Sequence, residues 1–351
     1  MINKVYLIIL NYNGWQDTIE CLESVLKSDY ENYQIIVVDN KSPNNSMEYI
    51  INWTEGKQEA VYDKNSQLKP LSQPFELKPL GYIYYTKEEA LQGGDSQKEE
   101  QYKNPLIFIQ SDENRGFAAG NNIGIKYILT RGDFEYVWLL NNDTVIESTT
   151  LSSLAEKFDY YKKTDNKVGL LGSKLRYYDN PLIIQAIGGN YNKWIGTSEH
   201  IGVFEMDYGQ YDNEKIVDAI DYPIGASLFV SKDFINDVGL MNEEYFLYYE
   251  ELDWVLRGRK KKWKIGFCWE SIVYHKEGSS IGTQRIQRSA LAEFYLFRNR
   301  LLFSKKFFKS YYSLVRIRLF LTYLKRLISR SRTEKIVNDA LCLKKKFEAI
   351  Q

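Results

Sequence analysis

Two continuous apolar runs with a helical segment between them constrain the fold of this chain more than any other feature. The runs "KVYLIIL" (4–10) and "YQIIVVD" (33–39) have the length of buried strands, and small polar residues follow each one. The intervening "DTIECLESVLKS" (17–28) has apolar residues at helical spacing after Asp17, a favourable helix N-cap. Apolar strands that alternate with helices are typical of α/β proteins, in which helices cover a mostly parallel sheet. Ligands in such proteins bind at the carboxyl ends of the strands.

The same alternation continues to about residue 275. We expect further strands within 105–111, 134–143, 168–178 and 263–275, and a strand followed by a helix in 220–241. Helices are expected within 121–132, which ends at Gly132, within 151–163, and as one or two basic helices in 288–329. Loops and short strands are expected in 181–215.

The pattern is lost between about residues 55 and 104, which are rich in Gln, Lys, Ser, Pro and Gly. A polar segment of this length without periodicity is typical of an extended or partly disordered insertion. We interpret it as a solvated excursion rather than as a lid over a functional site. The expected organisation is a main domain over 1–284 that contains this insertion, and an extension over 285–351.

The zero net charge of the chain hides a strong asymmetry. Residues 285–351 contain 17 Lys and Arg against 4 Asp and Glu, whereas the rest of the chain contains 29 against 42. The extension mixes these basic residues with aliphatic and aromatic ones, as amphipathic helices on anionic lipid do. Helices that pack on the main domain with a solvated charged face would show the same composition. No nucleic-acid partner is expected, since no recognised binding motif is present.

The cysteines and the apolar segments bear on the compartment. Cys21, Cys268 and Cys342 lie far apart and form no CxxC pair, which indicates a reducing compartment without a thiolate metal site. The first apolar run is too short for a signal peptide, and no stretch of about 20 apolar residues occurs. We therefore expect a cytoplasmic protein, peripheral on the inner face of the plasma membrane if the extension binds lipid.

Polar residues follow apolar runs at four places: Asn11 and Asn13; Asp39 and Asn40; Asn141, Asn142 and Asp143; and the acidic cluster "YYEELDW" (248–254). Helix caps and Asx turns explain Asn13 or Asn40 equally well. Asp143 is different, because a carboxylate directly after a buried strand costs free energy unless it is paired or bound to a metal. Mg²⁺ and Mn²⁺ are held by one or two carboxylates together with phosphate oxygens. Asp143 is thus a candidate ligand for a divalent cation on a nucleotide diphosphate.

Seven motifs in order carry a family resemblance: "NYNG", "VVDNKS", "NRGFAAGNNIGI", "WLLNNDT", "GASLFV", "YFLYYEELDWVLRGRKKKW" and "VYHKEGSS". The set resembles the inverting family 2 glycosyltransferases of GT-A fold, in particular the bacterial rhamnosyltransferase-like members that build surface polysaccharides. The resemblance covers residues 4–280 apart from the insertion. It implies a GT-A catalytic domain over 1–284 and a nucleotide-diphosphate sugar donor, with dTDP-rhamnose or a UDP-sugar favoured. It further implies a saccharide or lipid-linked saccharide acceptor.

The resemblance also implies donor and metal sites. The donor-binding candidates are Asn11, Tyr12, Asn13, Asp39, Asn40, Asn114, Arg115, Gly116, Asn122, Asn141 and Asn142. Asp39 would accept the N3–H of a uracil or thymine base, and Arg115 would help with the diphosphate charge although this position is not usually basic in the family. Asp143 matches the last carboxylate of the family's DxD motif, in which Asn141 here replaces the first Asp. His275 matches a metal-binding histidine of some members, so Mn²⁺ or Mg²⁺ is the expected cofactor.

The acidic cluster is expected to supply the catalytic base, which removes a proton from the acceptor hydroxyl. The family pattern Glu-Asp-x-Asp assigns that role to its second acid, here Glu251, where Glu replaces Asp. Glu250 and Asp253 share one face if the segment begins a helix, and either of them remains an alternative base or an acceptor contact. Gly225, Ala226, Ser227 and Trp254 are the expected acceptor-binding residues, with packing beneath the site as the alternative for Trp254.

Other function classes fit the sequence less well. The first strand is followed by no GxGxxG and none of the strands by GxxxxGK[ST], which disfavours a nucleotide-dependent oxidoreductase and a P-loop NTPase. A metal-dependent nucleotidyltransferase would lack the acidic cluster and the late histidine. A catalytically inactive sugar-nucleotide-binding scaffold remains the alternative from another class.

Overall fold

A central mixed sheet organises the chain in the computed structural model, which describes residues 2–63, 65–164, 167–276, 289–328 and 334–346. Its strand order is β3-β4-β2-β1-β5-β11-β7-β12-β6, with β8 beside β7, and β9 and β10 form a separate hairpin. The strands from β3 to β5 in this order are parallel, whereas β11 runs antiparallel to both of its neighbours. The predicted α/β fold with a mostly parallel sheet is confirmed. The strands are β1 (Val5–Asn11), β2 (Tyr33–Asp39), β3 (Tyr82–Thr86), β4 (Leu106–Gln110), β5 (Tyr136–Asn141), β6 (Thr144–Ile146), β7 (Val168–Tyr177), β8 (Ile184–Ala186), β9 (Gly189–Asn192), β10 (Thr197–His200), β11 (Ser227–Ser231) and β12 (Lys264–His275).

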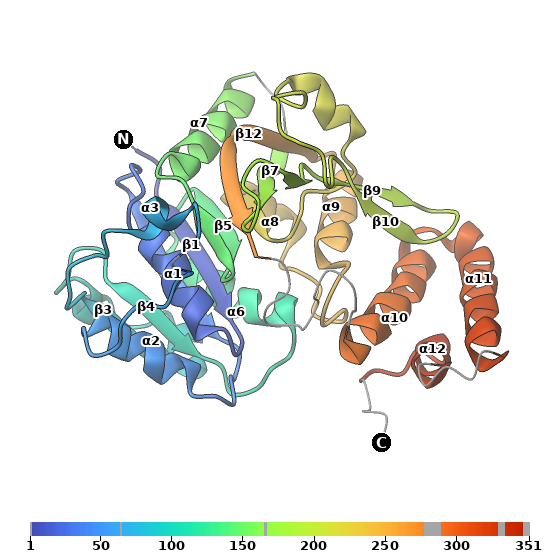
Figure 1. Ribbon diagram of the computed structural model, residues 1–351, viewed down its shortest axis with the longest axis horizontal. Coiled ribbons are helices and arrows are strands. Elements are labelled where there is room, and N and C mark those ends of the chain that lie inside the picture. The colour runs from blue at the N-terminus through green and yellow to red at the C-terminus, as the bar shows by residue number, and fades with distance from the viewer. Residues whose placement is uncertain (1, 64, 165–166, 277–288, 329–333, 347–351) are drawn as a thin grey trace.

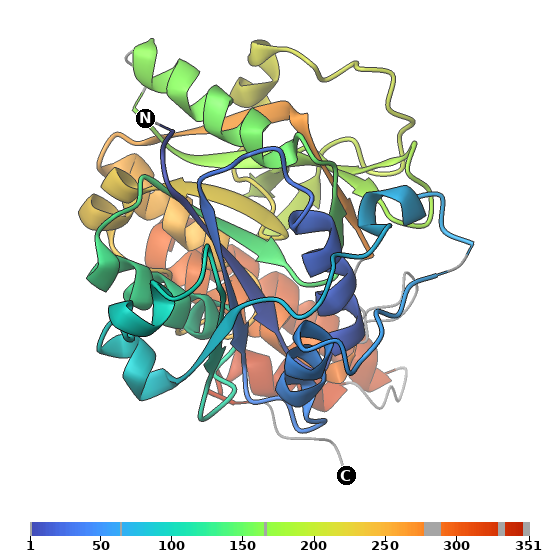
Figure 2. The ribbon, with the colours of Figure 1, turned by 90° about the vertical axis from the view of Figure 1, so that its left-hand side faces the viewer.

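Helices cover both faces of this sheet (Figures 1 and 2). Helices α1, α2 and α7 contribute to one buried apolar cluster, and α6, α8 and α9 contribute to the other. The helices of the body are α1 (Trp15–Val25), α2 (Ser46–Thr54), α3 (Lys69–Ser72), α4 (Lys87–Leu91), α5 (Ser96–Glu99), α6 (Phe117–Arg131), α7 (Thr150–Lys163), α8 (Lys232–Val238) and α9 (Glu250–Lys260), with a 3₁₀ turn η1 at Glu214–Ala219.

The two clusters explain why the first apolar run is continuous. Val5, Leu7 and Ile9 of β1 belong to the cluster beneath α1, whereas Tyr6 and Ile8 belong to the cluster beneath α6. Successive side chains of a strand point to opposite faces, so a strand buried on both faces has no polar positions until it ends.

The carboxyl ends of the parallel strands meet at one edge of the sheet. Asn11 pairs in register with Asp39, Leu10 with Asn141, and Asp39 with Gln110. Because β11 is antiparallel to β5, the residues that precede Ser227 lie at this same edge. The fold therefore gathers the predicted polar strand ends in one place.

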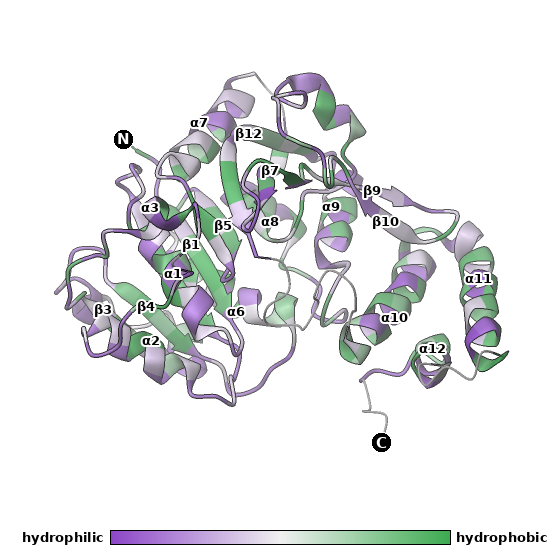
Figure 3. Cartoon of the chain, in the orientation of Figure 1, coloured by the Kyte–Doolittle hydropathy of each residue, from purple (hydrophilic) through white to green (hydrophobic). Residues whose placement is uncertain are grey.

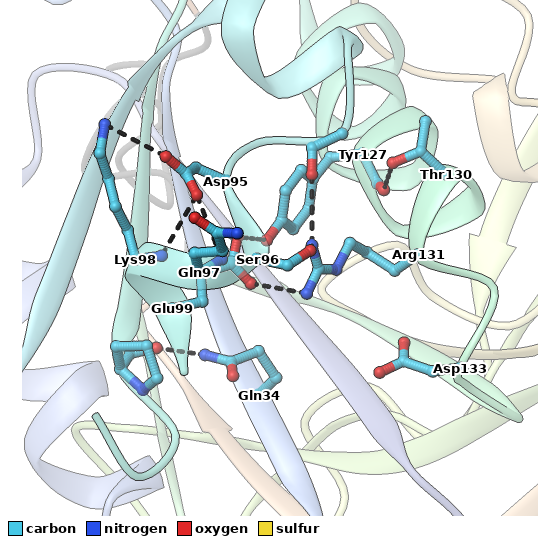
Figure 4. Close-up of polar contacts among 12 residues, drawn as sticks. Gln34, Asp95, Ser96, Gln97, Lys98, Glu99, Tyr127, Thr130, Arg131 and Asp133 are labelled. Carbon is cyan, nitrogen blue, oxygen red and sulfur yellow. Dashed lines mark hydrogen bonds and ion pairs between the residues drawn. The ribbon is translucent and has the colours of Figure 1, made fainter. Parts of the chain in front are cut away.

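The segment 55–104 differs from the expected extended insertion. Apart from residue 64, which lies outside the described residues, it contains α3, α4, α5 and the edge strand β3, which pairs with β4. Glu99 of α5 fixes the segment to the body: its carboxylate accepts hydrogen bonds from Tyr85 (2.8 Å) and Tyr127 (2.7 Å) and lies 3.0 Å from Arg131 of α6. Figure 4 shows Glu99 and Arg131 facing each other across this contact. Side-chain contacts of this kind are invisible to a composition argument, which is why the prediction was wrong here.

The basic extension forms α10 (Ala290–Phe307), α11 (Lys309–Ile328) and α12 (Glu334–Leu341), which share a small apolar cluster beside the body (Figure 1). The predicted basic helices are thus confirmed. The expected boundary at residue 284 lies within 277–288, outside the described residues, and the division into two domains stays a prediction. Among the helices that the structure describes, none is both long and apolar enough to cross a membrane.

Candidate active site

The carboxylate of Asp39 ties three strand ends together. Its Oδ1 accepts from Asn11 Nδ2 and Ser42 Oγ, each at 2.6 Å, and its Oδ2 accepts from the Ser42 amide (2.9 Å) and Gln110 Nε2 (2.8 Å). A carboxylate offers about four acceptor positions, so these donors occupy all of them. Asp39 is also 1% exposed. The predicted contact from Asp39 to a nucleobase would therefore have to displace a hydrogen bond that the fold already makes.

Asn142 and Asn122 are likewise engaged by the fold. The Asn142 amide donates to Gly14 O (3.2 Å) and Thr18 Oγ1 (3.1 Å) and holds the start of α1. Asn122 exchanges hydrogen bonds with the backbone of Met241 (3.0 and 3.1 Å) and donates to Glu243 Oε1 (3.0 Å). Both side chains are about 1–6% exposed. These contacts account for them as structural residues without a ligand.

Asn40 is the buried donor-site candidate that retains an unused polar atom. Its Nδ2 donates to Asn114 Oδ1 (2.9 Å) and Gly116 O (3.2 Å), while its Oδ1 is buried and has no hydrogen-bond partner. An unsatisfied buried acceptor is uncommon in a folded protein. Asn40 and Asn114 therefore link the end of β2 to the loop before α6, with one acceptor left for another group.

Gly116 brings two loops into contact. Its φ of +91° favours glycine, and a Cβ there would lie 2.1 Å from the carbonyl oxygen of Phe246. The amide of Phe117 donates to that same oxygen at 2.8 Å. Gly116, a donor-site candidate, thus makes its close approach to the 244–249 loop, which leads into α9.

The remaining donor-site candidates reach the surface. Tyr12 is half-buried and Asn13 is exposed beside the end of β1, where the backbone N–H of Asn13 donates to Ser42 Oγ (2.9 Å). Arg115 is exposed and lies 3.5 Å from both Glu113 and Glu243. These three side chains can move without breaking a buried contact, as ligand-facing groups must.

Asp143 and His275 converge where β5 and β12 end. His275 Nε2 lies 3.1 Å from Asp143 Oδ1 and 3.4 Å from Asn141 Nδ2, and Nδ1 donates to Gln185 Oε1 (2.7 Å). Burial opposes ionisation of the Asp143 carboxyl, but the charge and hydrogen bond of His275 outweigh it, with smaller contributions from a backbone amide and Lys276, so the pKa is lowered. The carboxylate is held in its ionised form.

This pair fits a particular kind of cation site. A carboxylate oxygen suits both Mn²⁺ and Mg²⁺, which complete their shells with phosphate oxygens and water, whereas an imidazole nitrogen is a ligand of transition metals and so favours Mn²⁺ of the two. Gln185 orients the imidazole from behind, as outer-shell partners of metal ligands commonly do. The described part of the chain contains no group of three or more His, Cys, Asp or Glu that could hold a metal ion. Asp143 and His275 supply two protein ligands, so a cation held by them would take further ligands from phosphate oxygens or water.

The two glutamates at the start of α9 lie in different environments. Glu250 is 1% exposed, and burial, followed by the charge of Glu251, raises its pKa well above the ordinary range. Glu251 is half-buried; desolvation raises its pKa to about 6, opposed by backbone hydrogen bonds from its own amide and from Gly225. The pKa of Glu250 is thus raised by burial and by a neighbouring charge, whereas Glu251, with a pKa of about 6, faces the Gly225 loop.

Asp253 and Trp254 point away from any open surface. Asp253 is fully buried and binds Arg257 Nε (2.6 Å), Tyr245 OH (3.0 Å) and Lys306. Trp254 has no exposed surface, and its Nε1 donates to Gly239 O (2.7 Å). The indole therefore takes the packing alternative and does not face an acceptor.

The three predicted acceptor-binding residues at 225–227 also differ in their burial and contacts. Ser227 is buried in a chain of hydroxyls, 2.9 Å from Trp138 Nε1 and 2.7 Å from Ser173 Oγ, and Ala226 is buried beside Asn141. A Cβ on Gly225 would lie 3.4 Å from Glu251 Oε1. Gly225 alone among the three is placed to border a group that reacts at Glu251.

The sequence arguments missed Gln185, Ser42 and Thr18. Gln185 contacts His275 and Thr18 contacts Asn11, and both come from segments outside the seven motifs. Ser42 contacts Asp39 and lies in the motif "VVDNKS", in which only Asp39 and Asn40 were considered as site residues. Only the register of the sheet and the loop connections bring them to the site.

Comparisons with known proteins show the family and the fold of the chain. Residues 6–72 and 95–223 match the family model described as glycosyl transferase family 2. The gap in this match, 73–94, falls inside the segment expected to be an insertion. The low-salt glycan biosynthesis hexosyltransferase Agl10 of Haloferax volcanii is 28% identical over 209 residues, which are 58% of this chain and 61% of that protein.

Two solved structures share the fold. One is the mannosyltransferase PcManGT from Pyrobaculum calidifontis, in complex with GDP-Man and Mn²⁺. The match has a TM-score of 0.51 at 11% identity and covers 100% of this chain and 77% of PcManGT. GalNAc-T7 with UDP, GalNAc and Mn²⁺ has a TM-score of 0.55 at 11% identity and covers 97% of this chain and 54% of its own. At this identity the likeness shows the fold alone, which is of the GT-A type.

Proposed function

Because the chain belongs to glycosyl transferase family 2, whose model matches more than half of it, we propose that it transfers a sugar with inversion. The donor is a nucleotide-diphosphate sugar, with dTDP-rhamnose or a UDP-sugar favoured, and the acceptor is a hydroxyl of a saccharide or lipid-linked saccharide in cell-surface polysaccharide synthesis. The observation that carries the proposal is the pairing of Asp143 with His275 at the same sheet edge that Glu251 and Gly225 border.

Glu251 is the catalytic base in this proposal. Its carboxylate takes the proton from the acceptor hydroxyl while that oxygen forms a bond to C1 of the donor sugar. The bond between C1 and the diphosphate oxygen breaks on the opposite side, and the nucleoside diphosphate leaves with the electron pair. A base works best when its pKa is near the working pH, which Glu251 satisfies, whereas Glu250 is buried away from an incoming hydroxyl. Asp253 is occupied by Arg257, Tyr245 and Lys306.

Asp143 and His275 hold the divalent cation in this proposal, with Gln185 fixing the imidazole. When bound, the cation offsets the charge that develops on the departing diphosphate. Tyr12, Asn13 and Arg115 are side chains that a nucleotide could contact at the surface, whereas the unused Oδ1 of Asn40 is buried and would need a local rearrangement to reach a ligand.

The extension is proposed to rest on an anionic membrane surface near a lipid-linked acceptor. Helix α11 packs on α10 and α12 through Val315 and Leu319, and its opposite side exposes Leu314, Ile317 and Leu321 at 46–58%. Arg316, Arg318 and Lys325 are exposed beside this apolar stripe. Figure 3 shows both polar and apolar residues along α11. Apolar stripes flanked by basic residues are the pattern of helices that lie in a lipid interface.

A thermal-shift screen tests the donor proposal. Nucleotide sugars are added with and without Mn²⁺, and a donor that binds the folded state raises the melting temperature by mass action. The stabilising donor is then incubated with saccharide acceptors, and the released nucleoside diphosphate is measured. Stabilisation followed by acceptor-dependent release supports the transferase. Stabilisation without any turnover would support the inactive scaffold, and release of pyrophosphate in the presence of a nucleoside triphosphate and a sugar phosphate would support a nucleotidyltransferase.

A further inference from the structure

Helix α10 of the basic extension binds the backbone of the loop that leads into α9, where Glu250 and Glu251 lie. Asn299 is fully buried, and its Nδ2 lies 2.8 Å from the carbonyl oxygen of Tyr245, 2.7 Å from that of Leu247 and 3.1 Å from that of Tyr248. Arg298, 4% exposed, donates from Nη1 to Glu244 O (3.1 Å) and to Asn299 Oδ1 (2.8 Å). Two consecutive side chains thus hold four carbonyl oxygens of one short loop.

This loop has a conformation that its own sequence does not favour. Phe246, Tyr248 and Tyr249 have φ values of +68°, +69° and +77°, although none of them is glycine. Such residues cost free energy and persist only where surrounding contacts hold them. Tyr249 caps α9 without a side-chain hydrogen bond to the helix. The contacts from α10 are therefore what fixes the backbone that enters α9.

The same loop connects both halves of the proposed site. Phe246 O accepts from the amide of Phe117 beside Gly116, at the end of the donor-side loop. Two residues beyond Tyr248, α9 begins with Glu250 and Glu251, and Tyr245 OH donates to Asp253 one turn further on. A shift of the loop would move the base relative to the donor.

We propose that Arg298 and Asn299 are positioning residues for the transfer reaction, which hold Glu251 at its working distance from the donor through the 244–249 loop. The extension is then part of the catalytic architecture as well as a membrane contact. This inference rests on the proposed role of Glu251 as base. A side chain that aligns the reacting groups contributes chiefly to kcat, because misalignment by about 1 Å can cost about 100-fold in rate.

The test compares Asn299→Ala with Glu293→Gln in the full chain. Glu293 is on the same helix, but its carboxylate pairs with Arg326 of α11 (3.0 Å) instead of with the 244–249 loop. For Asn299→Ala we expect kcat to fall by about 100-fold with little change in the donor KM. The acid limb of the pH–rate profile should also move to lower pH, because a displaced Glu251 is more hydrated and ionises more easily. Glu293→Gln should match the wild type in all three measurements.

A merely structural role predicts a different result. Asn299→Ala would then lower the melting temperature while kcat and the acid limb stay at their wild-type values, and this outcome would overturn the proposal. If Asn299→Ala does not fold, Asn299→Ser and Arg298→Lys replace it, since each retains part of the hydrogen bonding. Wild-type kcat and acid limb in both would equally overturn the proposal. Glu251→Gln is measured in parallel: if it retains full activity, the assignment of the base is wrong, independently of what Asn299 does.

Discussion

Nε2 of His275, the last residue of β12, lies 3.1 Å from Oδ1 of Asp143, which stands between β5 and β6 and next to Thr144, the partner of His275 in the sheet. The ring is held from behind by Gln185, whose Oε1 accepts from Nδ1 at 2.7 Å. The two proposed metal ligands, Asp143 and His275, can therefore be tested separately from Gln185, which orients the ring of His275.

Replacing the orienting group should weaken cation binding without abolishing it. We expect Gln185→Leu to reduce the apparent affinity for Mn²⁺ by about 10–100-fold, as loss of outer-shell hydrogen bonds to ligating histidines does. Asp143→Asn should have a larger effect, since it removes a ligand charge. The measurement is a Mn²⁺ titration of nucleotide-dependent thermal stabilisation and of transfer. Glu147→Gln, near the end of β6, is the control; equal Mn²⁺ dependence in the control and in Gln185→Leu would contradict the assignment.

The pH dependence of transfer should report Glu251. Its folded-state pKa is about 6, raised by desolvation, and the base must be ionised to work. Transfer at subsaturating substrate should therefore decline as the pH falls through about 6, rather than near the ordinary glutamate value. Glu251→Gln should reduce the rate by about 100-fold or more and remove this acid limb. An acid limb that survives in Glu251→Gln would assign it to another group.

Gly116 should tolerate no side chain. Gly116→Ala places a Cβ 2.1 Å from Phe246 O at a φ of +91°, so we expect a loss of about 1–3 kcal/mol in the free energy of unfolding and a large loss of transfer. Gly132→Ala is the matched control, because Gly132 also has a positive φ (+67°) but no atom lies within 4 Å of the added Cβ. Denaturant unfolding of the two variants measures the difference. Similar losses of unfolding free energy in both variants would mean that the clash with Phe246 O adds nothing to the cost of the positive φ.

The apolar stripe of α11 should govern lipid binding. Ile317→Glu combined with Leu321→Glu introduces charge at positions 56% and 58% exposed, and should abolish cosedimentation with vesicles that contain anionic phospholipid. Leu77→Glu, at an 89% exposed position in the body, should bind like the wild type. Wild-type protein that fails to bind anionic vesicles, or that binds neutral ones equally well, would refute the charge-assisted contact. A change in oligomeric state of the double variant would instead indicate that α11 meets a second copy of the chain.

The positions of the main strands, and the polar residues that follow them, could be predicted from the sequence. A strand that is buried on both faces is a continuous run of apolar residues, which is easy to recognise. The helix ends were less predictable. Asp17 was expected to cap α1, but the helix begins at Trp15 after Gly14, since Asn11 Oδ1 accepts from both the Gly14 amide and Thr18 Oγ1. The side chain at the end of β1 thus takes the capping role that was expected of Asp17. Gly132, where the signal is local, was placed correctly at the end of α6.

The candidate site was predictable as a set of strand ends but not as a set of contacts. Sequence spacing indicates which residues arrive at the edge, whereas the saturation of Asp39 by four donors depends on the register of β1, β2 and β4. Asn299 could not be recognised at all, because a lone asparagine in a basic helix gives no sign that its partners are carbonyl oxygens of residues 245–248.

The saturated carboxylate of Asp39 bears on attempts to redesign the nucleotide preference. Substituting it would loosen the junction of three strands before it altered any base contact. If the proposed donor site is correct, discrimination between pyrimidine and purine donors is better sought at the half-buried Tyr12 beside the end of β1 than at Asn13, whose φ of +60° favours Asn or Gly.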